Sequence, residues 1–238
     1  MMRIRIGPVS FAPGLATTAA AVATFALLAW LGVWQLERAA VKRERQALFD
    51  ARMVESPVQL TGSVPGPETL LYRRVRARGQ WIAEAQIFID NRIRDGRAGF
   101  EVITPLRLEG RPEAVLVNRG WIARGPEYPA APRVPVPQGV AEVGGLATLP
   151  PARVLELSSE TVSGNVWQNL SISRYAQRMH LEVLPIVVLS ATPAPGLAVV
   201  GEKPDAGVAK HLEYALTWFA LAITVAVLWI GLNVKRIR

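Results

Sequence analysis

The sequence predicts a membrane protein in which two transmembrane helices flank a mainly antiparallel β domain, barrel-like or sandwich-like, with a few short helices. Two apolar runs without a charge stand near the ends of the 238-residue chain, at residues 14–36 and 214–234. All 19 carboxylates lie between these runs. In that central segment, stretches that alternate polar and apolar residues are separated by turn signals, which is typical of antiparallel strands.

Residues 14–36 are 23 residues long, so as a helix they cover the roughly 30 Å hydrocarbon core of a bilayer. A cleavable secretory signal would have a shorter apolar core, and no Ala-x-Ala site follows this run before Glu37. The 13 residues before it are too few for a mitochondrial transit peptide. We therefore expect a retained anchor in a bacterial inner membrane, continued by residues 37–53 as a helical stalk.

Charge gives the orientation of the two anchors. The chain has 27 Lys and Arg residues, and the basic excess lies mostly at the two ends, which have no acidic residue. The positive-inside rule therefore places residues 1–13 and 235–238 in the cytoplasm and residues 37–213 in the periplasm. Four basic residues after the first anchor favour the opposite orientation, but long translocated domains escape this bias; they are Arg38, Lys42, Arg43 and Arg45. Because the excess charge lies beside apolar runs, we expect no nucleic-acid partner.

Small residues predict contact between the two anchors. Seven alanines occur in residues 14–36, and Ala222 and Ala226 are one turn apart in the second anchor. Small side chains permit the close approach on which helix packing in lipid depends. The alternative is that alanine is simply common in a sequence rich in Arg and poor in Lys.

The central segment predicts a meander of short strands. Residues 74–78 alternate polar and apolar side chains, and Asp95-Gly96 is a hairpin signal between two such runs. The predicted strands are residues 74–78, 86–90, 100–108, 114–118, 140–149, 165–172 and 184–189, with a helix at 173–179. Five prolines in residues 126–137 indicate a stiff polyproline crossing on the surface, or alternatively a recruitment motif.

No motif for an enzyme is present. The sequence has no G-x-G-x-x-G, Walker loop, G-x-S-x-G elbow or H-E-x-x-H. It has no cysteine, which excludes disulfides, thiol nucleophiles, Cys-ligated zinc and a Cys-based copper relay. Asp90 and Asp95 resemble an acid–base pair, but we expect both in a solvated, Arg-rich turn. We therefore expect a protein that is not an enzyme.

One constellation indicates a ligand site. His211 lies three residues before the second apolar run, with Tyr214 at i+3 and Trp218 at i+7 on one helical face. Imidazole is a common ligand of haem iron, so His211 is a candidate metal ligand and Tyr214 and Trp218 are candidate contacts of the macrocycle. The alternative is a set of interfacial residues without a ligand. His180 is expected to be structural.

The predicted topology brings the end of the first anchor to the level of His211. Trp34, Gln35 and Arg38 then lie near the outer boundary of the membrane. Arg38 or Lys210 is a candidate partner for haem propionates, because charge-assisted hydrogen bonds favour such pairs. A snorkelling interfacial arginine is the alternative for Arg38.

Three groups of residues resemble the surfeit locus family of cytochrome c oxidase assembly factors. Residues 32–38 resemble its G-x-W-Q-x-x-R signature at the end of the first anchor. Phe100, Thr104-Pro105-Leu106 and Leu116-Val117-Asn118-Arg119-Gly120-Trp121 resemble its centre, and residues 211–219 resemble its closing H-L-x-Y-A-x-T-W-F. The motifs stand in the family's order between the same two anchors. Ala209-Lys210 departs from the two asparagines that often precede the histidine in this family.

This resemblance implies an assembly factor for haem-copper terminal oxidases. It implies that His211 captures haem a transiently and passes it to the large catalytic subunit, with the haem a synthesis machinery as a second partner. Two alternatives remain at this point. One is a membrane scaffold that stabilises the nascent oxidase subunit without binding haem, and the other is a membrane-tethered module for an extracellular ligand.

Overall fold

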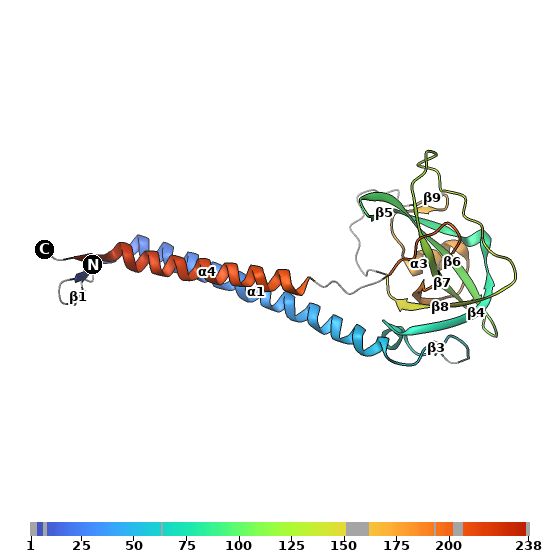
Figure 1. The fold of residues 1–238 in the computed structure, drawn as a ribbon, viewed down its shortest axis with the longest axis horizontal. Coiled ribbons are helices and arrows are strands. Elements are labelled where there is room, and N and C mark those ends of the chain that lie inside the picture. Colours follow the sequence, from blue (N-terminus) through green and yellow to red (C-terminus); the bar gives the residue numbers. More distant parts are fainter. Residues whose placement is uncertain are drawn as a thin grey trace. The chain divides into compact units, whose positions relative to one another are not determined.

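The structure is a computed structural model that describes residues 4–6, 9–62, 64–150, 162–192, 194–201 and 207–236. The chain divides into two compact units. One consists of Met1–Ala47 and Lys203–Arg238, and the other of Leu48–Glu202. Figure 1 shows the first as a pair of long helices and the second as a β domain.

The first unit is built on helices α1 (Leu15–Met53) and α4 (Val208–Asn233), which we call the helical hairpin (Figure 1). Both helices are long and apolar enough to cross a membrane, judged by length and composition. α1 runs without interruption through residues 37–53, which confirms the predicted helical stalk. α4 begins before its apolar run, so His211 lies in its first turn.

Strands β1 (Ile4–Ile6), β2 (Val9–Phe11) and β12 (Val234–Arg236) form a small antiparallel sheet that the sequence analysis did not predict. β12 follows α4 directly and pairs with β2, just before α1. The backbone N–H of Ala12 also donates to the carbonyl oxygen of Asn233, at 3.1 Å. The far ends of the two helices are therefore held together. Residues 1–3, 7–8 and 237–238 of the predicted tails lie outside the described residues.

The predicted contact between the two helices is confirmed. Gly32 of α1 is buried, and a Cβ added to it would lie 2.6 Å from Cε1 of Phe219 on α4. Ala215 and Ala222 on α4 are also buried. Trp229 donates its indole N–H to the Thr18 hydroxyl at 3.2 Å. Small residues therefore let the two backbones approach, as packing in lipid requires.

The second unit is a barrel, because five strands form a closed ring. In order around the ring these are β4 (Arg74–Trp81), β8 (Val140–Thr148), β11 (Val183–Ser190), β7 (Ala114–Ala123) and β6 (Arg97–Leu108). The end of β4 pairs with β6 and closes the ring. A Cβ at Gly79 would overlap the carbonyl oxygen of Arg107, so closure requires glycine there. All neighbours are antiparallel except β11 and β7.

Further strands extend the barrel sheet, and among the described residues three short helices lie between strands. They are β3 (Val58–Gln59), α2 (Pro67–Leu70), η1 (Ala83–Ala85), β5 (Ile87–Arg94), β9 (Val162–Ser163), β10 (Val166–Trp167) and α3 (Ile172–Met179). The predicted strand at residues 165–172 is wrong in length: only β10 is strand, and Ile172 already begins α3. The side chain of Ser171 caps α3 and ends the extended segment. The hairpin turn at Asp95-Gly96 is confirmed, with φ of 48° and 74°.

The barrel has an inner core to which all five strands of the ring contribute, and two further apolar clusters. Leu106, Val115 and Val188 belong to the inner core. α3 covers a second cluster through Tyr175, whose hydroxyl donates to the carbonyl oxygen of Ala85 at 2.6 Å. Phe88 and Phe100 form a third cluster with Val134 of the proline-rich crossing. The crossing is therefore packed on the barrel, as the surface-crossing interpretation predicted.

Candidate functional site

His211 is bonded to the other helix of the hairpin. Its ring Nδ1 lies 2.6 Å from Oε1 of Gln35 on α1, and both side chains are partly buried. An amide oxygen only accepts hydrogen bonds, so Nδ1–H of His211 donates. In the neutral form of a ring bonded in this way, the lone pair is on Nε2. A hydrogen bond at one ring nitrogen orients a ligand histidine and raises the basicity of the other. Nε2 is thus the ring atom of His211 that could bind a metal ion.

Gln35 is the partner that the sequence analysis did not assign to His211. The sequence analysis placed Gln35 only at the same depth in the membrane as His211. The asparagines that often precede this histidine in the family are replaced here by Ala209 and Lys210. The structure places the polar contact across the hairpin instead, where Gly32 brings the backbones close. The sequence indicates this hydrogen bond only if the two helices are already known to pack at Gly32, because that packing brings Gln35 and His211 together.

Arg38 lies one turn beyond Gln35 on α1, with its guanidinium carbon 5.5 Å from the ring centroid of Trp34. This is a cation–π arrangement, in which the arginine keeps its N–H donors available. Trp34 is 38% exposed, and Arg38 is exposed. Among the described residues the structure records no contact between this pair and His211, so Arg38 stays a candidate for a ligand's acidic groups rather than a partner of the histidine.

Tyr214 and Trp218 follow His211 on successive turns of α4. Tyr214 is 58% exposed and Trp218 is partly buried. Exposed aromatic side chains at this end of a membrane helix suit either the interface or the face of a flat apolar ligand. The described residues contain no group of three His, Cys, Asp or Glu that suits a bare metal ion. One imidazole with aromatic neighbours fits a haem held by a single protein ligand.

His180, in contrast, ends helix α3. It adopts the left-handed conformation at the C-cap, with φ of 51°, and its backbone N–H donates to the carbonyl oxygen of Ala176. Its position is therefore explained by the helix end, in agreement with the structural role expected from the sequence.

The Asn118-Arg119-Gly120-Trp121 motif of β7 holds the segment that leads to α4. We call residues 197–201 the strap. Trp121 exchanges two backbone hydrogen bonds with Ala198, of 2.7 and 2.8 Å. Gly120 has a φ of +139°, and a Cβ there would lie 2.8 Å from the carbonyl oxygen of Ala198. Only glycine permits both this conformation and the approach of the strap.

Arg119 is a buried cation that fixes the proline-rich crossing. It donates to Oε1 of Gln86 and to the carbonyl oxygen of Pro135, both at 3.0 Å, and lies over the ring of Trp81. Thr104 donates to the same Gln86 oxygen at 2.8 Å. Burial lowers the pKa of the Arg119 guanidinium. Thr104 and Arg119, which belong to the family motifs, therefore stabilise the fold of the barrel.

Asn118 is hydrogen-bonded to a partly buried carboxylate. Its amide nitrogen donates to Oε2 of Glu101 at 2.8 Å, and its oxygen accepts from the backbone N–H of Gly120 at 3.1 Å. Burial raises the pKa of the Glu101 carboxyl, although Arg92 and the bond from Asn118 oppose this effect. Nothing in the spacing of Glu101 and Asn118 along the chain indicated this pair.

The solvated-turn prediction is correct for Asp95 and wrong for Asp90. Asp95 is at the hairpin tip, with its side chain 92% exposed. The Asp90 side chain is only 16% exposed and accepts two hydrogen bonds from Arg124, of 2.8 and 3.1 Å. The two aspartates do not form an acid–base pair, because one is neutralised by an ion pair and the other faces solvent.

Comparison with known proteins gives a consistent result. The profile of the SURF1 family matches residues 22–223. The chain is 25% identical over 216 residues to a SURF1-like protein of Monosiga brevicollis, covering 86% of this chain and 83% of the relative. It is 26% identical to surfeit locus protein 1 of Xenopus tropicalis, covering 91% and 74%. A SURF1-like protein of Rickettsia felis is 26% identical, covering 87% and 92%.

Proposed function

The chain belongs to the SURF1 family, and on that premise we propose that it is a non-enzymatic assembly factor for haem-copper terminal oxidases, acting on haem a. The three motifs that resemble oxidase assembly factors all lie within the matched residues 22–223. The observation that carries the proposal is the 2.6 Å hydrogen bond between His211 and Gln35, since it leaves the histidine's Nε2 available for iron.

The proposed site lies at one end of the helical hairpin. His211 is the iron ligand, Gln35 orients its ring, and Tyr214 and Trp218 contact the macrocycle. Arg38 pairs with the propionates through the guanidinium that lies over Trp34. A single protein ligand holds the cargo weakly enough for release to the large catalytic subunit of the oxidase. The haem a synthesis machinery is the expected donor.

We place this protein in a bacterial inner membrane, with both termini in the cytoplasm and the barrel in the periplasm. The antiparallel hairpin supports termini on one side, because β2 and β12 pair beyond the ends of α1 and α4. The acid-free basic tails support the cytoplasm as that side.

An absorption spectrum of the purified full chain, produced together with haem a synthesis enzymes, tests the proposal. The wild type should retain haem a, and His211→Ala should reduce occupancy by roughly tenfold, because the axial bond is lost. His180→Ala is the matched control and should keep wild-type occupancy. Gln35→Leu leaves His211 in place and should shift the haem spectrum or midpoint potential. Equal occupancy in wild type and His211→Ala would contradict the proposal.

A scaffold that never binds haem is the second candidate function. The same His211–Gln35 bond favours it, because a hydrogen bond between helices also stabilises packing in lipid. The scaffold predicts no haem spectrum from the wild-type chain. It also predicts that His211→Ala lowers the thermal stability of the hairpin, whereas a pure ligand role changes occupancy first.

A further inference from the structure

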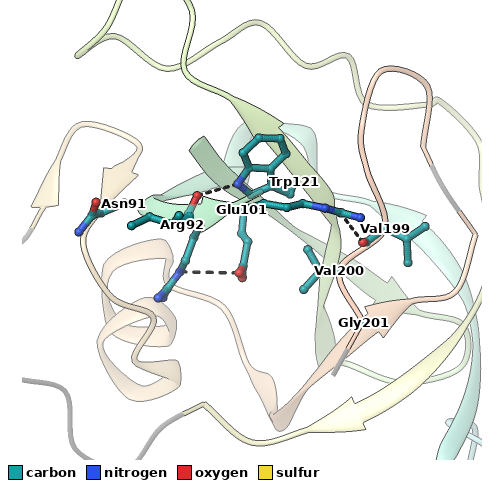
Figure 2. Close-up of a pocket in the computed structure, with 9 residues that line it drawn as sticks. Asn91, Arg92, Glu101, Trp121, Val199, Val200 and Gly201 are labelled. Atoms are coloured by element: carbon teal, nitrogen blue, oxygen red, sulfur yellow. Dashed lines mark hydrogen bonds and ion pairs between the residues drawn. The ribbon is translucent and has the colours of Figure 1, made fainter. Parts of the chain in front are cut away.

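The barrel has a groove that the proposed function does not use. It has a volume of about 560 Å³, within the range of small-ligand sites, and lies between the β5–β6 hairpin and the strap. Figure 2 shows Asn91, Arg92, Glu101 and Trp121 near the strap residues Val199, Val200 and Gly201.

The groove contains a cation whose pairing is incomplete. Nε of Arg92 is buried and makes no hydrogen bond to any described residue. The nearest carboxylate oxygen, Oε1 of Glu101, is 3.8 Å away, too far for a hydrogen bond (Figure 2). Glu101 is held back because its other oxygen accepts from Asn118 at 2.8 Å. Protein atoms enclose Nε, but the Arg92 side chain is 36% exposed, so its terminal N–H groups are the donors that an incoming acceptor can reach.

Two hydrogen bonds hold the backbone from which Arg92 enters the groove. Trp121 donates its indole N–H to the carbonyl oxygen of Arg92 at 2.7 Å. Arg94 donates to the carbonyl oxygen of Val199 at 2.7 Å, which ties the hairpin to the strap. Both contacts are drawn in Figure 2. The two arginines and Glu101 leave the groove lining with a net positive charge.

Apolar side chains form another part of the groove lining. Trp121, Ile93, Val199 and Val200 contribute to its lining, and Ile93 is 72% exposed although it lies in a strand. Covering such a side chain is favourable, at roughly 25 cal/mol per Å² of apolar surface. A ligand that suits this groove therefore combines an acidic group with an apolar body.

We propose that the groove between the β5–β6 hairpin and the strap is a binding site for a carboxylate carried on an apolar body, with Arg92 as its anchor. The carboxylate accepts from the two terminal nitrogens of the Arg92 guanidinium, as a pair of parallel hydrogen bonds. The apolar body lies against Trp121, Ile93 and Val200. The site is independent of His211 and of the proposed haem delivery.

The test uses the full chain in lipid nanodiscs with 4-phenylbutyrate as the probe. The ¹⁵N-labelled indole of Trp121, assigned with Trp121→Phe, reports on the groove because it is bonded to Arg92. We expect a saturable shift of this signal. Arg92→Gln should weaken binding by at least about tenfold, as the loss of a charge-assisted pair predicts. The Trp121 indole signal of ligand-free Arg92→Gln should equal that of the wild type. This will show that the variant is folded, because the indole N–H donates to the backbone carbonyl oxygen of residue 92.

Matched variants and probes make the outcome decisive. Arg97→Gln, in the same hairpin but outside the groove lining, should bind like the wild type. Glu101→Gln should bind roughly threefold more tightly, because a repelling charge is removed. Acetate, which lacks the apolar body, and 4-phenylbutanol, which lacks the charge, should bind at least severalfold more weakly.

A peptide arm separates two sources of the same chemistry. If Ac-Leu-Asp-Leu-NH2 binds more tightly than 4-phenylbutyrate and Ac-Leu-Asn-Leu-NH2 does not, the source is a partner's acidic side chain; the reverse order indicates a free acid. No saturable shift with either acid, equal binding by Arg92→Gln, or equal binding of the alcohol would overturn the proposal.

Discussion

The helical hairpin and the barrel both contain residues of the family motifs, yet the two regions present them differently. In the barrel, Arg119 is 4% exposed and Thr104 is fully buried, and their hydrogen bonds end on the barrel's own atoms. In the hairpin, Trp34 is 38% and Tyr214 58% exposed. Motif membership alone therefore does not separate folding from function in this chain.

This contrast predicts that barrel variants change stability and hairpin variants change haem retention. The largest expected effect is in the barrel, at Gly120. Gly120→Ala forces a Cβ into left-handed backbone and against the strap, at 2.8 Å from the carbonyl oxygen of Ala198. We expect the barrel to lose about 3 kcal/mol of stability, measured by thermal unfolding in near-ultraviolet circular dichroism.

Gly144→Ala is the control for that variant. Gly144 has no described atom within 4 Å of an added Cβ and no unusual φ, so stability should change little. Equal destabilisation by both substitutions would show that the strap contact does not matter.

The next effect is in the hairpin, at Gly32. Gly32→Val places a branched side chain against Phe219 and should separate the helices near Gln35 and His211. We expect roughly tenfold lower haem occupancy, about 1.4 kcal/mol, with unchanged barrel unfolding. Gly231→Val in α4, where a Cβ meets nothing within 4 Å, is the control. Retained occupancy in Gly32→Val would break the proposed link between helix packing and the site.

A smaller effect is expected at Arg38. Arg38→Gln removes the charge that lies over Trp34 and should weaken haem retention severalfold, consistent with one partly exposed charge-assisted contact of about 1 kcal/mol. Arg43→Gln, further along the stalk, should have no effect. Equal loss in the two variants indicates a general effect of charge at the membrane surface instead.

The smallest effect concerns pH and returns to the barrel. Burial raises the pKa of Glu101 in the folded chain above its unfolded value. The folded state therefore binds the Glu101 proton more tightly than the unfolded state does. The stability that this protonation contributes is fully present below the unfolded pKa and is lost as the pH rises through the folded pKa. Glu101→Gln lacks this dependence. The stability of the wild type relative to Glu101→Gln should thus fall as the pH rises above the ordinary pKa of a glutamate carboxyl, measured by thermal unfolding. A constant difference would show that the carboxyl is not perturbed.

Local patterns predicted much of the fold. The alternation at residues 74–78 predicted β4, and Asp95-Gly96 predicted the β5–β6 turn, because both signals act between near neighbours in the chain. The parallel pairing of β11 with β7 was not predicted, since these strands are far apart in sequence. The predicted strand at residues 165–172 was too long because the cap at Ser171 competes with extension.

The candidate site was predicted in part. His211, Tyr214 and Trp218 followed from helical spacing within one element. The bond from His211 to Gln35 joins residues 176 positions apart, so it depends on helix packing that spacing does not contain. Asp90 illustrates the same limit, because its partner Arg124 comes from another strand end and turns an apparently solvated carboxylate into an ion pair.

The pairing of β2 with β12 near the chain ends fixes the lengthwise alignment of α1 against α4. At one end of the hairpin, Phe11 is opposite Val234 in the β2–β12 pair; at the other, Gln35 bonds His211. A strand ladder repeats every two residues, about 6.8 Å, whereas a helix repeats every turn, about 5.4 Å. If α4 shifted along α1 by one strand repeat, the β2–β12 pairing could form again, but His211 would no longer be level with Gln35. These mismatched repeats leave a single longitudinal alignment, so the histidine keeps a constant height along the helix pair.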